Sequence, residues 1–208
     1  MAIERFEDMN AVALDVFREI GSIGVGNAAT ALSEVLGVKV KMKLPKVTIE
    51  GYDAAIASIG HPEDMVAAVL VEMGGDIQGI MLYMLKLDFI NAILARLVGK
   101  YIEDFSQIDE LSASALEETG NIIISSYVNA IAKLAGLEVP LSVPSISVNM
   151  LGGILSVPMA MFGEVSDKLM MIQGEFLIGD TQLEGDLLLL PDIESLNFLL
   201  EKLGVANV

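Results

Sequence analysis

The feature that most constrains the fold of this chain is a long internal repeat. The 26 residues from Ile20 to Pro45 align without a gap with the residues from Thr119 to Pro144. The offset is constant, because 119 − 20 and 144 − 45 both equal 99. Each stretch reads as the end of a helix, a stop glycine, a strand and a proline. Because chance rarely produces such a match, we interpret the chain as two copies of one folding unit.

The ends of the two halves also correspond. Residues 79–99 and 185–204 each read as an apolar strand followed by an amphipathic helix that stops at a glycine. An aspartate suited to cap the helix precedes each one, Asp88 and Asp192. We therefore predict one domain over residues 1–208, made of two pseudo-symmetric halves at about 9–102 and 109–205.

Hydrophobic periodicity predicts the elements of each half. Long helices are expected over residues 9–36 and 109–135, and three glycines, Gly21, Gly24 and Gly26, are expected to loosen the first by roughly 1 kcal/mol each. Strands are predicted at 38–49, 65–73 and 77–85, and again at 145–157, 168–177 and 182–190. Neither half alternates strand and helix as a doubly wound sheet would. The predicted class is α+β, with antiparallel strands and two long helices related by a pseudo-twofold axis.

Composition excludes several classes of function. The chain has no cysteine and a single histidine, His61, in a turn-like sequence, so thiolate chemistry and histidine-rich metal sites within one chain are excluded. A net charge of −17 argues against binding nucleic acid. The longest uncharged stretch, residues 139–163, is broken by prolines, so we expect no membrane insertion. The N-terminus shows no secretory signal, so the expected location is cytoplasmic.

Each long predicted helix carries polar residues at matching positions. In the second helix, Ser114, Glu118 and Asn121 lie at i, i+4 and i+7, and therefore within about 60° of one another. One alternative is that they belong to the solvated face of an amphipathic helix. Their repetition favours a functional site, because the first helix has polar residues at the same offsets. Each triplet has a glycine directly before its last member, and a proline lies 23 positions after that member. The matching residues are Asp15, Glu19 and Ser22, and the prolines are Pro45 and Pro144.

Glutamate and asparagine side chains are suited to different chemical roles. An asparagine amide does not titrate, so it is no general base, but its donor and acceptor can hold a water molecule. Orienting water for in-line attack on a phosphoryl group is a known role of an amide side chain. A glutamate can pair with a lysine of a partner. Such a site is half of an active site, and the substrate protein has to bring its own Mg²⁺ and phosphate ligands.

The duplicated pattern resembles the motif of the CheC/CheX/FliY family of chemotaxis response-regulator phosphatases: Asp or Ser, three residues, Glu, two residues, Asn, twenty-two residues, Pro. The resemblance runs from about residue 12 to residue 204. It implies hydrolysis of the aspartyl phosphate of a CheY-type response regulator, with Glu118 pairing with the receiver's invariant lysine and Asn121 positioning the attacking water. It also implies no cofactor beyond the Mg²⁺ that the receiver carries.

The two copies differ at one decisive position. The second keeps Ser114, Glu118, Asn121 and Pro144, whereas the first has Ser22 where the family has Asn. A serine hydroxyl is shorter than an amide and reaches less far into a partner. We therefore predict that the first site, Glu19 and Ser22 with Asp15 and Pro45 as supporting residues, is weak or silent.

Two alternatives remain open at this point. The chain can instead be a non-catalytic adaptor that binds a receiver or CheD, the receptor deamidase that the resemblance implies as a second partner. CheC-like chains often have Asp-Met after the second proline, whereas this chain has Asn149 and Met150 within an apolar segment. A flagellar-switch component would require an additional domain. Because internal duplication can replace a symmetric dimer, we expect a monomer.

Overall fold

An antiparallel sheet organises the chain in a computed structural model that describes residues 3–162 and 168–205. Within these ranges the sheet has seven strands in the order β1-β6-β7-β4-β3-β5, and β2 pairs with the other part of β6. Its antiparallel pairing, together with the helices around it, confirms the predicted α+β class. The strands are β1 (Val40–Met42), β2 (Lys46–Gly51), β3 (Met65–Met73), β4 (Gly79–Leu85), β5 (Ser145–Met150), β6 (Lys168–Ile178) and β7 (Thr181–Pro191).

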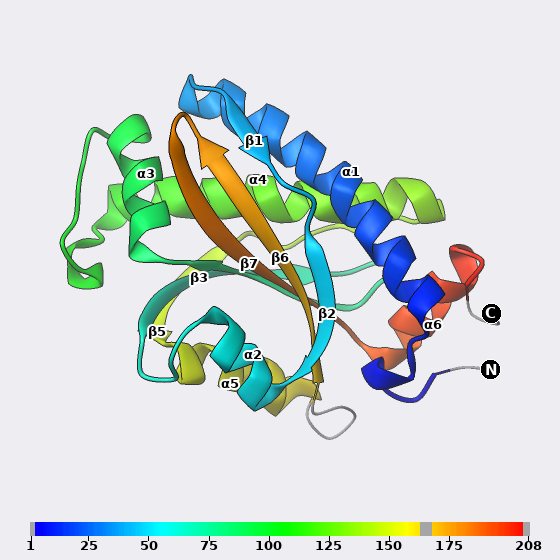
Figure 1. Ribbon diagram of the computed structural model, residues 1–208. Helices are drawn as coiled ribbons and strands as arrows, with labels where there is room; N and C mark the ends of the chain where they lie inside the picture. The colour runs from blue at the N-terminus through cyan, green and yellow to red at the C-terminus, as the bar shows by residue number, and fades with distance from the viewer. Residues whose placement is uncertain (1–2, 163–167, 206–208) are drawn as a thin grey trace.

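Helices cover both faces of the sheet. Figure 1 shows the two long helices, α1 and α4, on one side and the short helices α2 and α5 on the other. The larger hydrophobic cluster includes buried residues of α1, α3, α4, α6 and the sheet, and a smaller cluster joins α2 and α5 to the opposite face. The helices are α1 (Ala11–Leu36), α2 (Tyr52–Ile59), α3 (Leu87–Leu97), α4 (Glu110–Ala135), α5 (Leu151–Phe162) and α6 (Ile193–Lys202), with short 3₁₀ turns at Phe6–Asp8 and Phe105–Gln107.

The order of elements recurs along the chain. The first half runs α1, β1, β2, α2, β3, β4, α3, and the second runs α4, β5, α5, β6, β7, α6, so the order recurs apart from the short β1. In the sheet, β2-β6-β7 on one side mirrors β5-β3-β4 on the other. This order is consistent with the repeat inferred from the sequence, and it means that strands of one half pair mainly with strands of the other.

Two predicted strands are shorter than expected. The strand predicted over 38–49 is split into β1 and β2, because Pro45 has no N–H for the ladder and turns inward, where it is buried. The strand predicted over 145–157 ends at Met150, and α5 begins at once with Leu151. β5 is also mostly exposed, because it forms an edge of the sheet and pairs only with β3.

The predicted helix ends are largely correct. Asn10 caps α1 and Asp192 caps α6, each accepting a hydrogen bond from a backbone N–H of the first turn. Asp88 was expected to cap α3, but the cap position is Lys86 and Asp88 lies within the first turn. Gly37 ends α1 with φ of +63°, a left-handed conformation that favours glycine.

The glycines of α1 do not interrupt the helix, which is continuous from Ala11 to Leu36. Gly21 and Gly24 are buried where α4 crosses: a Cβ at Gly24 would lie 2.9 Å from the Cα of Tyr127, and one at Gly21 would lie 2.9 Å from its hydroxyl. That hydroxyl donates a 3.1 Å hydrogen bond to the carbonyl of Phe17. The expectation that these two glycines loosen the helix was therefore wrong: they allow α1 and α4 to approach closely.

The described ranges contain no helix that combines the length and apolar character needed to cross a bilayer.

One carboxylate lies within the sheet. Asp186 of β7 is 4% exposed and accepts a 3.0 Å hydrogen bond from Nε2 of Gln173 on the neighbouring strand. Burial raises the pKa of Asp186, and the negative charges of Glu184 and Glu50 raise it too, while the hydrogen bond from Gln173 and the charge of Lys86 oppose the shift. The charged form of this side chain is therefore disfavoured in the folded protein.

Replacing Asp186 with asparagine is expected to stabilise the protein at neutral pH. The folded-state pKa lies above the ordinary value of 3.8, so stability is lost as the pH rises from about 4 through the folded-state pKa. Asparagine cannot ionise, and its Oδ1 can still accept the bond from Gln173. Thermal melts of both proteins at pH 4 and pH 7 should show a larger Tm advantage of the variant at pH 7. An equal difference at both values would contradict this assignment.

Candidate functional site

Helix α4 presents the complete copy of the motif on its exposed side. The helix begins after Asp109, whose carboxylate accepts hydrogen bonds from the Ser112 N–H (2.9 Å) and from Nζ of Lys100 (2.8 Å). These bonds, that of Lys100 foremost, hold the pKa of Asp109 well below its usual range. A fixed first turn determines which residues face the sheet and which face solvent. Ser114 and Glu118 are exposed and Asn121 is half-buried, whereas the remaining face is buried by Leu116, Thr119, Gly120, Ile123 and Ile124.

Two polar side chains of this copy, Glu118 and Asn121, have no hydrogen-bond or ion-pair partner among the described residues. Glu118 and Asn121 are separated by about 4.5 Å along the helix axis, so one partner surface can meet both. An exposed carboxylate and an amide on a rigid helix, both unpaired, are suited to a partner that brings the complementary groups.

The helix lies very close to the sheet at this point. A Cβ on Gly120 would lie 2.7–2.8 Å from the Cβ and both Cγ atoms of Val69 on β3, so only glycine fits. This explains the glycine that precedes Asn121 in the sequence. On the neighbouring residue Glu117, Oε1 accepts a 3.1 Å hydrogen bond from the N–H of Ile146, which fixes the start of β5 just after Pro144.

The first copy of the motif lies on α1 in a similar position but with different electrostatics. Asp15 and Glu19 are exposed and Ser22 is half-buried. Asp15 is ion-paired with Arg18, one turn further along the helix. The corresponding residue of α4 is Glu117, because 117 − 18 equals 99.

Sequence reasoning missed Arg18. The reversal of charge at equivalent positions of the repeat was visible in the sequence and would have found it. Because Arg18 is paired with Asp15, the two charges of that pair offset each other, and the two copies differ in their charge pattern at this position.

The motif prolines differ in their packing. Pro45 is buried, and a Cβ on Gly21 would lie 2.9 Å from its Cγ. The 22 residues between Ser22 and Pro45 thus bring the chain back onto the same helix. Pro144 is half-buried at the entrance to β5.

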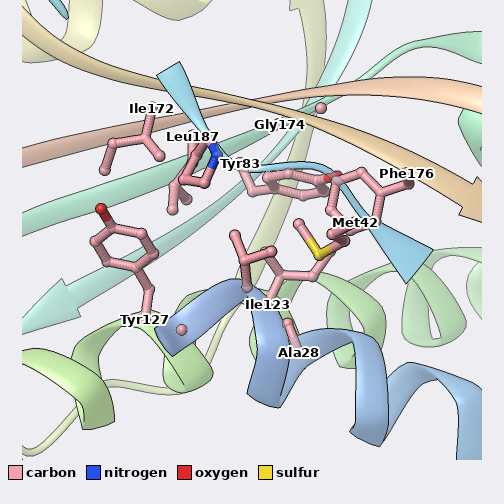
Figure 2. A pocket seen from close by; sticks show the side chains of 13 residues that line it. Ala28, Met42, Tyr83, Ile123, Tyr127, Ile172, Gly174, Phe176 and Leu187 are labelled. Carbon is pink, nitrogen blue, oxygen red and sulfur yellow. The ribbon is translucent and has the colours of Figure 1, made fainter. Parts of the chain in front are cut away.

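A small cavity lies between the two long helices and the sheet. Figure 2 shows it lined by Met42, Tyr83, Ile123, Tyr127 and Phe176, among others. Its volume is about 20 Å³, room for roughly one water molecule, and its lining is mostly apolar. The buried hydroxyl of Tyr83 has no hydrogen-bond partner among the described residues. This cavity is too small to admit a phosphorylated metabolite.

Metal-ligand clusters are not found in the described ranges, where no group of three or more histidine, aspartate or glutamate side chains is placed to hold an ion. His61 is exposed in the turn after α2, where its backbone N–H donates a 2.7 Å hydrogen bond to Oδ2 of Asp64. This agrees with its interpretation as a solvated turn residue.

One protein family matches both copies of the repeat. The sequence profile of the CheC-like family matches residues 12–49 and, separately, residues 111–148. Both ends of the two segments differ by 99 positions, which is the offset of the repeat, and each segment contains one copy of the motif. In these two segments the chain resembles the CheC-like family. The match covers the helix, the stop glycine and the proline of each half.

Individual proteins of known name or structure are similar over nearly the whole chain. A Bacillus subtilis (strain 168) protein named CheY-P phosphatase CheC is 29% identical over 206 residues, which cover 97% of this chain and 98% of that protein. The crystal structure of Thermotoga maritima FliY superimposes with a TM-score of 0.73, at 22% identity, over 94% of this chain and 99% of that one. FliM in its Helicobacter pylori complex with SpeE gives a TM-score of 0.72 at 15% identity, over 96% of this chain and 98% of that one. The two structures show that this chain shares its fold with FliY and FliM.

Proposed function

We propose that this protein hydrolyses the aspartyl phosphate of a CheY-type receiver domain, acting mainly through α4. The observation that carries the proposal is the pair of unpartnered side chains, Glu118 and Asn121, on the exposed face of a helix that is held tightly against the sheet. The similarity to a CheY-P phosphatase over nearly the whole chain supports the choice of substrate.

The roles follow from the chemistry of the two groups. The Glu118 carboxylate pairs with the receiver's lysine and fixes the relative position of the two proteins. The Asn121 amide accepts a hydrogen bond from water and donates one to the reacting centre, which places the water oxygen in line with the phosphorus. The P–O bond to the receiver's aspartate breaks as the new P–O bond forms, giving inorganic phosphate and a free carboxylate. The Mg²⁺ that neutralises the phosphoryl oxygens belongs to the receiver.

A second candidate function is that of a non-catalytic adaptor. The observation that favours it is the exposed edge strand β5, where Val148 is 37% and Met150 is 51% exposed next to Asn149. An exposed strand edge offers backbone groups to a partner, and CheD is the partner implied by the family resemblance. The fold shared with FliM is also compatible with a binding role.

The lifetime of a phosphorylated CheY-type receiver in Mg²⁺ distinguishes these functions. We expect addition of this protein to shorten the lifetime catalytically, with inorganic phosphate released in more than one turnover per molecule. Unchanged decay together with measurable binding of the phosphorylated receiver would instead establish the adaptor function. If the protein neither accelerated decay nor bound the receiver, both functions would be excluded for that receiver.

A further inference from the structure

An apolar side chain extends the polar stripe of α4 toward the start of the helix. Leu111 is 65% exposed and contributes to neither hydrophobic cluster of the described structure. By helix geometry it lies about 20° from Glu118 around the axis and about 10 Å from it along the axis. Leu111, Ser114, Glu118 and Asn121 therefore form one continuous stripe, which we call the α4 stripe.

The same arrangement recurs on α1. Val12 corresponds to Leu111 at the offset of 99, is 43% exposed, and stands in the same relation to Glu19 as Leu111 does to Glu118. A single exposed leucine on a protein surface needs no explanation. An exposed apolar side chain at the same place beside both copies of the motif does need one, because neither contributes to the core.

A second pair of exposed apolar residues also recurs in the two long helices, but it lies on a different face from the motif. Val35 is 46% and Leu134 is 49% exposed, and these two also correspond at the offset of 99. Leu134, however, lies about 160° from Glu118 around the helix axis, on a different face. A third recurring pair, Leu44 and Val143, is 79% and 86% exposed directly before the motif prolines, outside the helices. Of the two recurring pairs within the long helices, only Val12 and Leu111 share a face with the motif.

We propose that Leu111 is an apolar anchor for the receiver domain, and this inference rests on the proposed function. A partner whose lysine meets Glu118 and whose phosphoryl group meets Asn121 covers the α4 stripe, and Leu111 lies on the same side, two turns away. Besides Leu111, the stripe offers only polar or charged side chains, and Glu110 next to Leu111 is acidic too. Interfaces of this kind commonly depend on a few apolar anchors surrounded by polar contacts.

The anchor acts on docking and not on the chemical step. Leu111 lies about 15 Å along the axis from Asn121, too far to contact the reacting atoms. It contributes equally to the ground state and the transition state, so its loss should raise KM and leave kcat unchanged. Truncating one such anchor is expected to weaken binding by roughly tenfold.

The test is steady-state dephosphorylation as a function of receiver concentration, with the full-length protein, Leu111→Ser and Leu134→Ser. Both variants replace an exposed leucine of the same helix, so they share any cost to the helix itself. We expect KM to rise by roughly tenfold for Leu111→Ser with kcat within about twofold, and no change for Leu134→Ser. Leu111→Met, which keeps an apolar side chain, should restore most of the affinity. Equal KM values for the two serine variants, or a fall in kcat for Leu111→Ser, would overturn the anchor.

A binding measurement separates this proposal from the proposed function. If the unmodified protein does not accelerate dephosphorylation, the phosphatase proposal fails, but the affinity for a receiver activated with beryllium fluoride still tests Leu111. Weaker binding by Leu111→Ser than by Leu134→Ser then supports the anchor, and equal or absent binding rejects it.

Discussion

Replacement of Asn121 with alanine is expected to slow dephosphorylation of the receiver by about 10²–10³-fold. Loss of one positioned polar group that acts on the reacting centre commonly has an effect of this size. Alanine preserves the helix, and the Asn121 side chain makes no hydrogen bond within the described structure, so folding should be unaffected. The rate of phosphate release at saturating receiver concentration measures the effect, and circular dichroism verifies the fold.

Ser22→Ala is the matched control for this prediction. Ser22 occupies the equivalent position of α1 and is also half-buried, but its side chain is shorter than that of asparagine. We expect the Ser22 variant to keep most of the activity. A large loss in Ser22→Ala together with full activity in Asn121→Ala would assign catalysis to the first copy and contradict the proposed roles.

Replacement of Gly120 with alanine is expected to destabilise the protein by about 1–3 kcal/mol. The added methyl group would meet the Cβ and both Cγ atoms of Val69 within 2.7–2.8 Å. Val69 cannot move aside easily, because it is fully buried in β3 between β4 and β5. The intrinsic helix preference of alanine offsets only about 1 kcal/mol of the strain. For a chain of this size we expect a fall in Tm of roughly 2–4 °C per kcal/mol in thermal melts.

Gly26→Ala provides the opposite case. Gly26 is also helical, but it is exposed and a Cβ there would have no neighbour within 4 Å. Alanine should therefore raise the stability by about 0.5–1 kcal/mol. Equal shifts in Tm for the two variants would show that helix propensity, and not the approach of α4 to the sheet, explains the glycine before Asn121.

These glycines also show how far the sequence could predict the fold. The repeat and the periodicity located both long helices and placed β3 at residues 65–73, as observed, because local patterns determine such elements. Helix propensity alone made Gly21 and Gly24 look like weak points. Their role depends on Tyr127, which lies about a hundred residues away in the sequence, and single-sequence patterns carry no information on such contacts.

The candidate site was more predictable than its surroundings. Helical spacing was sufficient to place Ser114, Glu118 and Asn121 on one exposed face of α4. Two contacts near the motif depend on the folded geometry. They are the ion pair of Asp15 with Arg18 and the hydrogen bond that the Ile146 N–H donates to Glu117. The break at Pro45 has the same origin, because that residue leaves the sheet to cover Gly21.

The interleaved sheet has a consequence for synthesis of the protein. β2 pairs with β6, and their partners Lys46 and Gln173 are 173 − 46 = 127 positions apart. At about 5–20 residues per second, β6 is translated roughly 6–25 s after β2. During this interval the nascent first half exposes strand edges and apolar surface that no local segment can cover. The ribosome-bound chain therefore passes through a stage at which protection by chaperones matters, whereas in the finished sheet β6 and β7 pair with β2 and β4.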